Sequence, residues 1–139
     1  MHEPRREQVS PLFPVDGFRV LDSMLTNARR VSRELNTILA EIGLREDSWR
    51  TLLALEARPG MLMSDIAEAL TVSNATVTRL VNDLVDEGSV YRKPGPDDGR
   101  SIVVHLSRQG RQRLARANAL IEGRLDFTPI APSFHTLSR

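Results

Sequence analysis

Apolar residues recur at steps of three and four along residues 16–42, the spacing of one face of an α-helix. The members of this stripe are Leu21, Leu25, Ala28, Val31, Leu35, Ile38 and Ile42. Asp16 can cap the start of such a helix, and Gly43 fits its end. Because so long a helix outruns the core of a small domain, it is expected to pack on a partner. A long helix packed within one chain is the alternative.

Three shorter helical patterns follow. The first covers residues 47–57, the second covers residues 65–70 with Ser64 as its cap, and the third covers residues 74–87 with Ser73 as its cap. The apolar residues expected to face the core are Trp49, Leu52, Leu53, Leu55, Ile66, Ala67, Leu70, Val77, Leu80, Val81 and Leu84.

The pattern then changes to strands. Residues 89–93 and 100–106 are expected to form a hairpin, because the second segment alternates and residues 94–99 are rich in turn formers. The better-buried face should hold Ile102, Val104 and Leu106. Ser107 can cap a last helix that extends to residue 125. Its apolar face consists of Leu114, Ala117, Ile121 and Leu125.

The order helix, turn, longer helix and two-stranded ribbon is typical of a winged helix-turn-helix. The predicted fold is therefore mainly α with a small β-wing, and residues 47–106 form the winged unit. The flanking helices, residues 16–42 and 107–125, are expected to mediate dimerisation. At 139 residues, the chain is predicted to be a single domain over residues 1–139.

Composition excludes several classes of site. The chain has no cysteine, so it has no disulfides and no thiolate metal site. Its three histidines, His2, His105 and His135, show neither metal-ligand spacing nor a nucleophile-base pattern. We therefore expect no enzyme activity, no metal and no cofactor. The first residues lack the apolar core of a signal peptide, and no apolar run could span a bilayer, so a cytoplasmic location is expected.

Charge is unevenly distributed along the chain. Residues 88–118 carry seven basic and two acidic side chains, a balance of +5, whereas residues 41–87 have a balance of −5. A basic segment beside a recognition unit suits a polyanion partner. A solvated helix face is the alternative.

The third short helix offers candidates for reading DNA. Removing its apolar stripe leaves Asn74, Thr76, Thr78, Arg79 and Asn82. Side chains near the N-terminus of such a helix reach base edges in the major groove, where Asn74 can pair with adenine and Arg79 with guanine. Ser73 and Thr76 suit phosphate oxygens, although simple capping explains Ser73 equally well.

The hairpin offers a second contact surface. Arg100 near its tip can enter a narrow minor groove, while Arg92 and Lys93 approach the flanking phosphates. Alternatively, Arg100 forms an ion pair with Asp98 that stiffens the wing.

Two segments resemble the MarR family of bacterial transcription regulators. They are SDIAEALTVSNATVTRLV, over residues 64–81, and DDGRSIVVHLSRQG, over residues 97–110. The resemblance extends over residues 17–125. It implies a homodimer that binds a pseudo-palindromic operator in double-stranded DNA, usually as a repressor. It also implies release from DNA by a small phenolic or aromatic ligand, for which the sequence assigns no residues.

The chain departs from the family pattern in two places. The family's wing often reads Asp-Arg-Arg, but Gly99 stands between Asp98 and Arg100 here. The family usually ends in a further helix, whereas residues 127–139 are expected to form an irregular tail. A winged-helix module that binds proteins rather than DNA is the alternative function.

Overall fold

A computed structural model describes residues 16–97 and 101–126, which form five helices and one small sheet. The elements are α1 (Gly17–Ala40), α2 (Glu46–Ala57), β1 (Met61–Leu62), α3 (Met63–Leu70), α4 (Asn74–Asp86), β2 (Val90–Pro94), β3 (Ile102–Leu106) and α5 (Arg108–Arg124). The predicted winged helix-turn-helix, mainly helical with a small sheet, is confirmed. The predicted tail and residues 98–100 lie outside the described residues.

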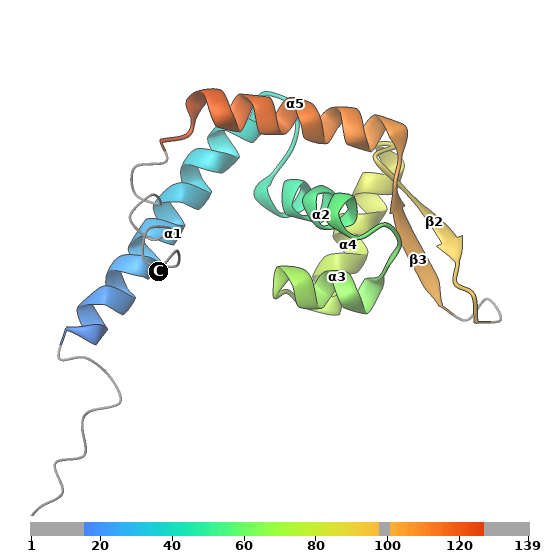
Figure 1. Ribbon diagram of the computed structural model, residues 1–139, viewed down its shortest axis with the longest axis horizontal. Helices are drawn as coiled ribbons and strands as arrows, with labels where there is room; N and C mark the ends of the chain where they lie inside the picture. The colour runs from blue at the N-terminus through green and yellow to red at the C-terminus, as the bar shows by residue number, and fades with distance from the viewer. Residues whose placement is uncertain (1–15, 98–100, 127–139) are drawn as a thin grey trace, which may run out of the picture.

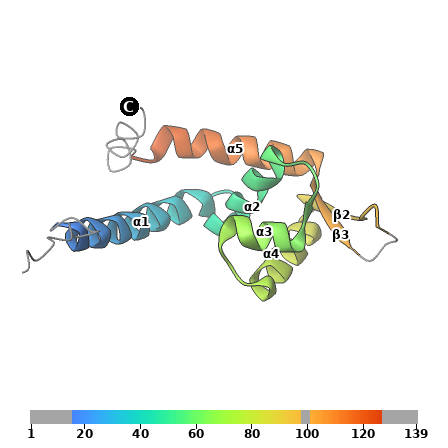
Figure 2. The ribbon, with the colours of Figure 1, turned by 60° about the horizontal axis from the view of Figure 1, so that its bottom comes forward.

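The helices form an arm, which consists of α1 and α5, and a lobe. Helices α2, α3 and α4 pack together as the lobe, while α5 runs along the opposite side of the molecule from α3 and α4 (Figures 1 and 2). Helix α1 meets α5 at its C-terminal end and extends away from the lobe, and the wing projects from the other end (Figure 1). No helix in the described ranges is long and apolar enough to cross a membrane.

The sheet contains a strand that the sequence did not predict. Strand β1 pairs antiparallel with β3 through Met61 opposite Val104, so the strand order is β1-β3-β2. Gly60 precedes this strand with φ +76°, a conformation that favours glycine. A Cβ at Gly60 would also lie 3.0 Å from the His105 ring. The expected alternation of β3 is confirmed at Val104 and Leu106, which are buried, but Ile102 is exposed.

Two predicted helix caps are present and two are not. The Oγ atoms of Ser73 and Ser107 accept hydrogen bonds from the first turns of α4 and α5. Asp16 precedes α1 but makes no side-chain capping bond. Ser64 lies inside α3, because the helix begins directly after β1. Its Asp65 carboxylate instead accepts a 3.1 Å hydrogen bond from the Leu62 backbone N–H.

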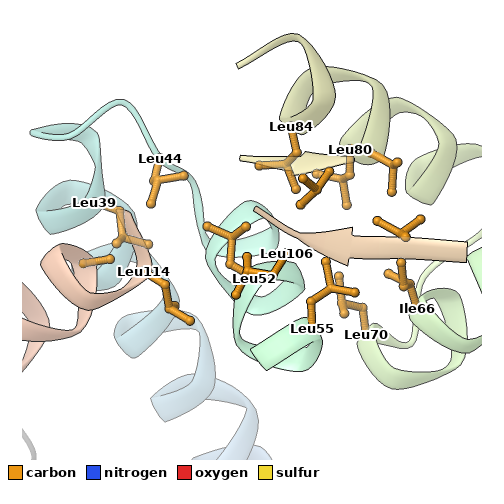
Figure 3. Packing of buried hydrophobic residues seen from close by; sticks show 14 of the residues in the cluster. Leu39, Leu44, Leu52, Leu55, Ile66, Leu70, Leu80, Leu84, Leu106 and Leu114 are labelled. Atoms are coloured by element: carbon orange, nitrogen blue, oxygen red, sulfur yellow. The ribbon is translucent and has the colours of Figure 1, made fainter. Parts of the chain in front are cut away.

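One continuous apolar core joins the arm to the lobe (Figure 3). Its members include Leu39, Leu44, Leu52, Leu55, Ile66, Leu70, Leu80, Leu84, Leu106 and Leu114. These positions confirm the predicted stripes of α2 to α5, except that Leu53 is 40% exposed. Trp49 packs against this core, and its Nε1 donates a 2.8 Å hydrogen bond to the Asn118 Oδ1 on α5.

The apolar stripe of α1 is divided between core and surface. Leu35 and Ile38 are buried, as predicted. The N-terminal half carries exposed apolar side chains: Phe18, Val20, Leu21, Met24 and Leu25. The N-terminal half of α1, which extends beyond the lobe, therefore presents an exposed apolar surface.

Candidate nucleic-acid interface

Helix α4 has one buried and one polar face. The buried face consists of Val77, Leu80, Val81 and Leu84. The predicted DNA-contacting residues lie on the opposite face: Asn74, Thr78, Arg79 and Asn82 are exposed, as is the preceding Ser73, and Thr76 is half-buried. The structure thus brings all six together on one side of the helix.

The N-terminus of α4 is tightly capped. Ser73 Oγ accepts a 3.2 Å hydrogen bond from the Thr76 backbone N–H and lies 2.9 Å from the Thr76 hydroxyl. Thr78 Oγ1 donates to the Asn74 carbonyl at 3.0 Å. Capping by Ser73 is therefore confirmed, and its contact with phosphate stays a prediction.

The turn between α3 and α4 sets the angle between these two helices, of which α4 is the candidate recognition helix. Thr71 adopts a left-handed conformation with φ +56°, which is strained for a β-branched residue. The backbone N–H of Val72 closes the turn on the Ala67 carbonyl at 3.1 Å. Arg50 on α2 donates to the Leu70 carbonyl at 3.1 Å and so satisfies the end of α3. This role of Arg50 could not be predicted from the sequence, since its partner lies on another helix.

The wing is joined directly to the recognition helix. The Arg92 guanidinium on β2 donates a hydrogen bond to the Asn82 Oδ1 on α4. Both side chains were predicted to contact DNA separately, and both are exposed. Their bond makes α4 and β2 one continuous polar surface.

An aromatic stack that sequence reasoning missed lies on the wing. The rings of Tyr91 on β2 and His105 on β3 are 5.3 Å apart and inclined by 14°. Lys93 Nζ lies 5.5 Å from the centre of the Tyr91 ring. Lys93 is exposed beside this stack. Asp98 and Arg100 lie outside the described residues, so both roles of Arg100 stay open.

The basic segment is divided between the wing and α5. Arg92 and Lys93 lie on β2, but the chain turns at Ser107 and leads into α5, which lies on the far side from α3 and α4 (Figure 1). Helix α5 carries Arg108, Arg111 and Arg116, and Arg116 lines a hollow together with Glu87 at the end of α4. The expectation of a basic zone beside the recognition unit stays a prediction.

The described residues contain no group of three or more histidine or acidic side chains that could hold a metal ion. His105, the one histidine within residues 16–97 and 101–126, lies on β3 and packs on Tyr91.

Comparison with known proteins identifies this architecture. A model of the MarR family matches residues 42–101, from the end of α1 to the wing. The transcriptional repressor CouR, solved bound to a 23-mer DNA duplex, is similar at a TM-score of 0.73 and 28% identity, over 89% of this chain and 92% of that one. The chain is similar to the MarR family over its helix-turn-helix and the start of its wing.

Two curated relatives of the chain are regulators. It is 28% identical over 100 residues to a putative transcriptional regulatory protein for the hcr operon of Thauera aromatica, covering 72% of the chain and 58% of the relative. It is also 28% identical over 87 residues to the transcriptional repressor IacR of Pseudomonas putida, covering 63% and 52%. The chain thus spans a little over half the length of each relative. Both names agree with the expectation that the chain is not an enzyme.

Proposed function

We propose that the chain is a transcriptional regulator that binds double-stranded DNA through α4 and the wing. The polar face of α4, continuous with β2 through the bond between Arg92 and Asn82, is the observation that carries this proposal. The DNA-bound state of CouR supports it.

The side chains on this surface have different proposed roles. The major groove admits one α-helix, and the N-terminal residues of α4 would read base edges there. The Asn74 amide presents one donor and one acceptor, which suit adenine. The Arg79 guanidinium presents two donors, which suit guanine. Ser73, Thr76 and Lys93 would contact phosphates and fix the register of the helix. Arg92, held by Asn82, would contact a phosphate from the base of the wing.

We further propose that the protein acts as a homodimer on a pseudo-palindromic operator and represses transcription. The exposed apolar half of α1 supports this, since such a surface is typical of a subunit interface. A two-fold dimer would present its two α4 helices to half-sites roughly 34–36 Å apart, one turn of DNA.

A groove between α1 and the start of α2 is our candidate for effector binding. Its volume is about 530 Å³, and its lining is Leu25, Ala28, Arg29, Ser32, Arg33, Asn36 and Glu46. The apolar Leu25 and Ala28, together with the exposed Arg29 and Arg33, suit a small aromatic carboxylate. Addition of 4-hydroxybenzoate to the DNA complex should release the protein, and Arg33→Ala should weaken that response. DNA binding that is insensitive to such acids would contradict this effector class.

Salt dependence of DNA binding tests the proposal as a whole. The logarithm of the affinity for the gene's own upstream region should fall linearly with the logarithm of salt concentration. The slope should be about −0.9 for each phosphate that the protein neutralises. Absence of binding at low salt would overturn the proposal and favour a winged-helix module that binds proteins.

Arg79→Ala is expected to weaken specific binding by roughly 1–3 kcal/mol and to relax sequence preference at one position. The expected cause is loss of a bidentate contact to a guanine edge. Gel-shift assays on operator variants measure both effects. Arg111→Ala is the matched control and should leave affinity unchanged, because Arg111 is an exposed residue of α5, the helix on the opposite side from α3 and α4 (Figure 1). Equal weakening on every sequence would show that Arg79 contacts phosphate only.

A further inference from the structure

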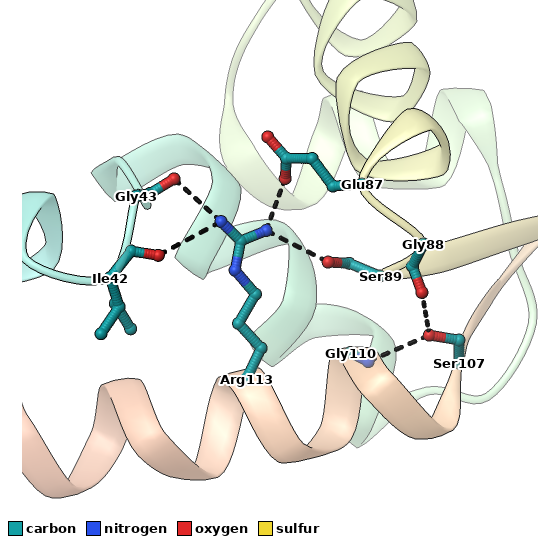
Figure 4. A network of polar contacts seen from close by, with 8 residues as sticks. All are labelled: Ile42, Gly43, Glu87, Gly88, Ser89, Ser107, Gly110 and Arg113. Carbon is teal, nitrogen blue, oxygen red and sulfur yellow. Dashed lines mark hydrogen bonds and ion pairs between the residues drawn. The ribbon is translucent and has the colours of Figure 1, made fainter.

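Arg113 on α5 lies where the arm, the recognition helix and the wing meet (Figure 4). Its Nη2 donates to the carbonyls of Ile42 at 3.3 Å and Gly43 at 2.8 Å, just after α1. Its Nη1 donates to the Glu87 carboxylate at the end of α4 and, at 3.2 Å, to the Ser89 hydroxyl before β2. One guanidinium therefore has four acceptors on three segments.

The geometry of this contact is directional. A guanidinium is planar and rigid, so its hydrogen bonds fix the directions of their acceptors. The Arg113 side chain is 22% exposed, which limits competition from water. The apolar contacts between α2 and α5 also hold the lobe to the arm, but apolar burial has no preferred direction. Arg113 is therefore suited to fix the angle between the lobe and the arm, and not only to stabilise their contact.

A second set of bonds joins the same elements beside Arg113 (Figure 4). Ser107 Oγ donates to the Gly88 carbonyl at 2.6 Å and accepts from the Gly110 N–H at 2.9 Å. The Ser107 N–H donates to the Ser89 carbonyl at 3.0 Å. The start of α5 is thereby fixed to the segment between α4 and β2, and the Arg113 side chain extends this fixation to the end of α1.

We infer that Arg113 is a positioning residue that fixes the orientation of α4 and the wing relative to the arm formed by α1 and α5. In a dimer joined through the arms, this orientation sets the separation of the two recognition helices. Arg113 would then determine which spacing of operator half-sites the protein accepts. This last step rests on the proposed function, whereas the positioning role itself applies to the DNA-free protein.

Binding to duplexes with altered half-site spacing tests the functional consequence. The wild-type protein should bind one spacing best and lose about tenfold in affinity for each base pair inserted or removed, because its two helices are held in one register. Arg113→Met approximately keeps the length of the side chain but removes the guanidinium and its hydrogen bonds. This variant should bind the best site roughly tenfold more weakly and discriminate between spacings by less than about threefold, since it has lost preorganisation.

Arg124→Met provides a matched control. Arg124 also lies on α5 and forms an ion pair with Glu41 after α1, but among the described residues no hydrogen bond or ion pair joins it to α4 or β2. Its loss should leave spacing preference unchanged. A merely structural role of Arg113 would lower thermal stability in Arg113→Met while preserving spacing preference, and that result would overturn the inference.

A measurement without DNA separates this inference from the proposed function. Because the chain lacks cysteine, spin labels can be attached through Thr37→Cys on α1 and Asp83→Cys on α4, both exposed positions. Labelled chains are diluted with unlabelled protein so that only the distance between the two labels of one chain is measured. This distance should have one narrow distribution, which Arg113→Met should broaden and Arg124→Met should not. An equally narrow distribution in Arg113→Met would refute the positioning role. A broadened distribution in a protein that binds no DNA would support that role and overturn the proposed function instead.

Discussion

Replacing Gly110 with alanine should lower the free energy of unfolding by about 3 kcal/mol, at the upper end of typical overpacking effects. A Cβ at Gly110 would lie 2.0 Å from the Ser89 carbonyl oxygen and 2.8 Å from Leu106 Cδ1. The Ser89 oxygen is a backbone atom that accepts a hydrogen bond from the Ser107 N–H. It cannot move aside without breaking the connection between α5 and β2. Denaturant unfolding followed by circular dichroism measures the loss.

Gly123→Ala is the control for this substitution on the same helix. Among the described residues outside the local helix backbone, none has a heavy atom within 4 Å of a Cβ at Gly123. Alanine should therefore raise stability there by about 0.5–1 kcal/mol through its higher helix propensity. A Gly110→Ala protein as stable as the wild type would contradict the close approach of α5 to the start of β2.

Introducing two glutamates by Leu21→Glu and Leu25→Glu should dissociate the proposed dimer. These side chains are 47% and 51% exposed and lie one helical turn apart on α1, so the folded protomer tolerates the change. In a dimer interface, the same charges would be buried without partners. Operator affinity should then fall by roughly 100-fold or more, because binding of the second half-site would no longer be intramolecular.

Sedimentation velocity and gel-shift assays together check this result. A Thr37→Glu, Ala40→Glu variant adds the same two charges to exposed positions of α1 near the lobe and should remain dimeric. A monomeric wild type, or a doubly substituted protein that still sediments as a dimer, would contradict an interface on the N-terminal half of α1.

The parts of the fold that the sequence predicted correctly depend on local signals. Ser73 and Ser107 cap helices through bonds to residues three positions ahead, and such spacing is visible in the chain. Strand β1 was missed because two residues show no periodicity and its pairing with β3 is long-range. The assignment of Ser64 as a cap was wrong for the same reason, since β1 determines where α3 begins.

The residues of the candidate site also fall into two groups, those predictable from local pattern and those that depend on tertiary packing. The polar face of α4 follows from its apolar stripe, so Asn74 and Arg79 could be found without coordinates. The bond from Arg92 to Asn82 depends on how the wing packs on α4. Arg113 looked like one more charge in a basic segment, because its partners Ile42 and Gly43 lie about half the chain away. A charge count along the sequence carries no information on the direction in which α5 leaves the wing.

The order of the three strands has a consequence for aggregation. Strands β1 and β2 form the two edges of the sheet, and an exposed edge can pair with the edge of another molecule. Strand β1 is only two residues long, and β2 carries Arg92 and Lys93 before it ends at Pro94, which has no N–H to donate. Short length, charge and proline all discourage intermolecular β-pairing. The wing can therefore project far into solvent without becoming a nucleus for fibril formation.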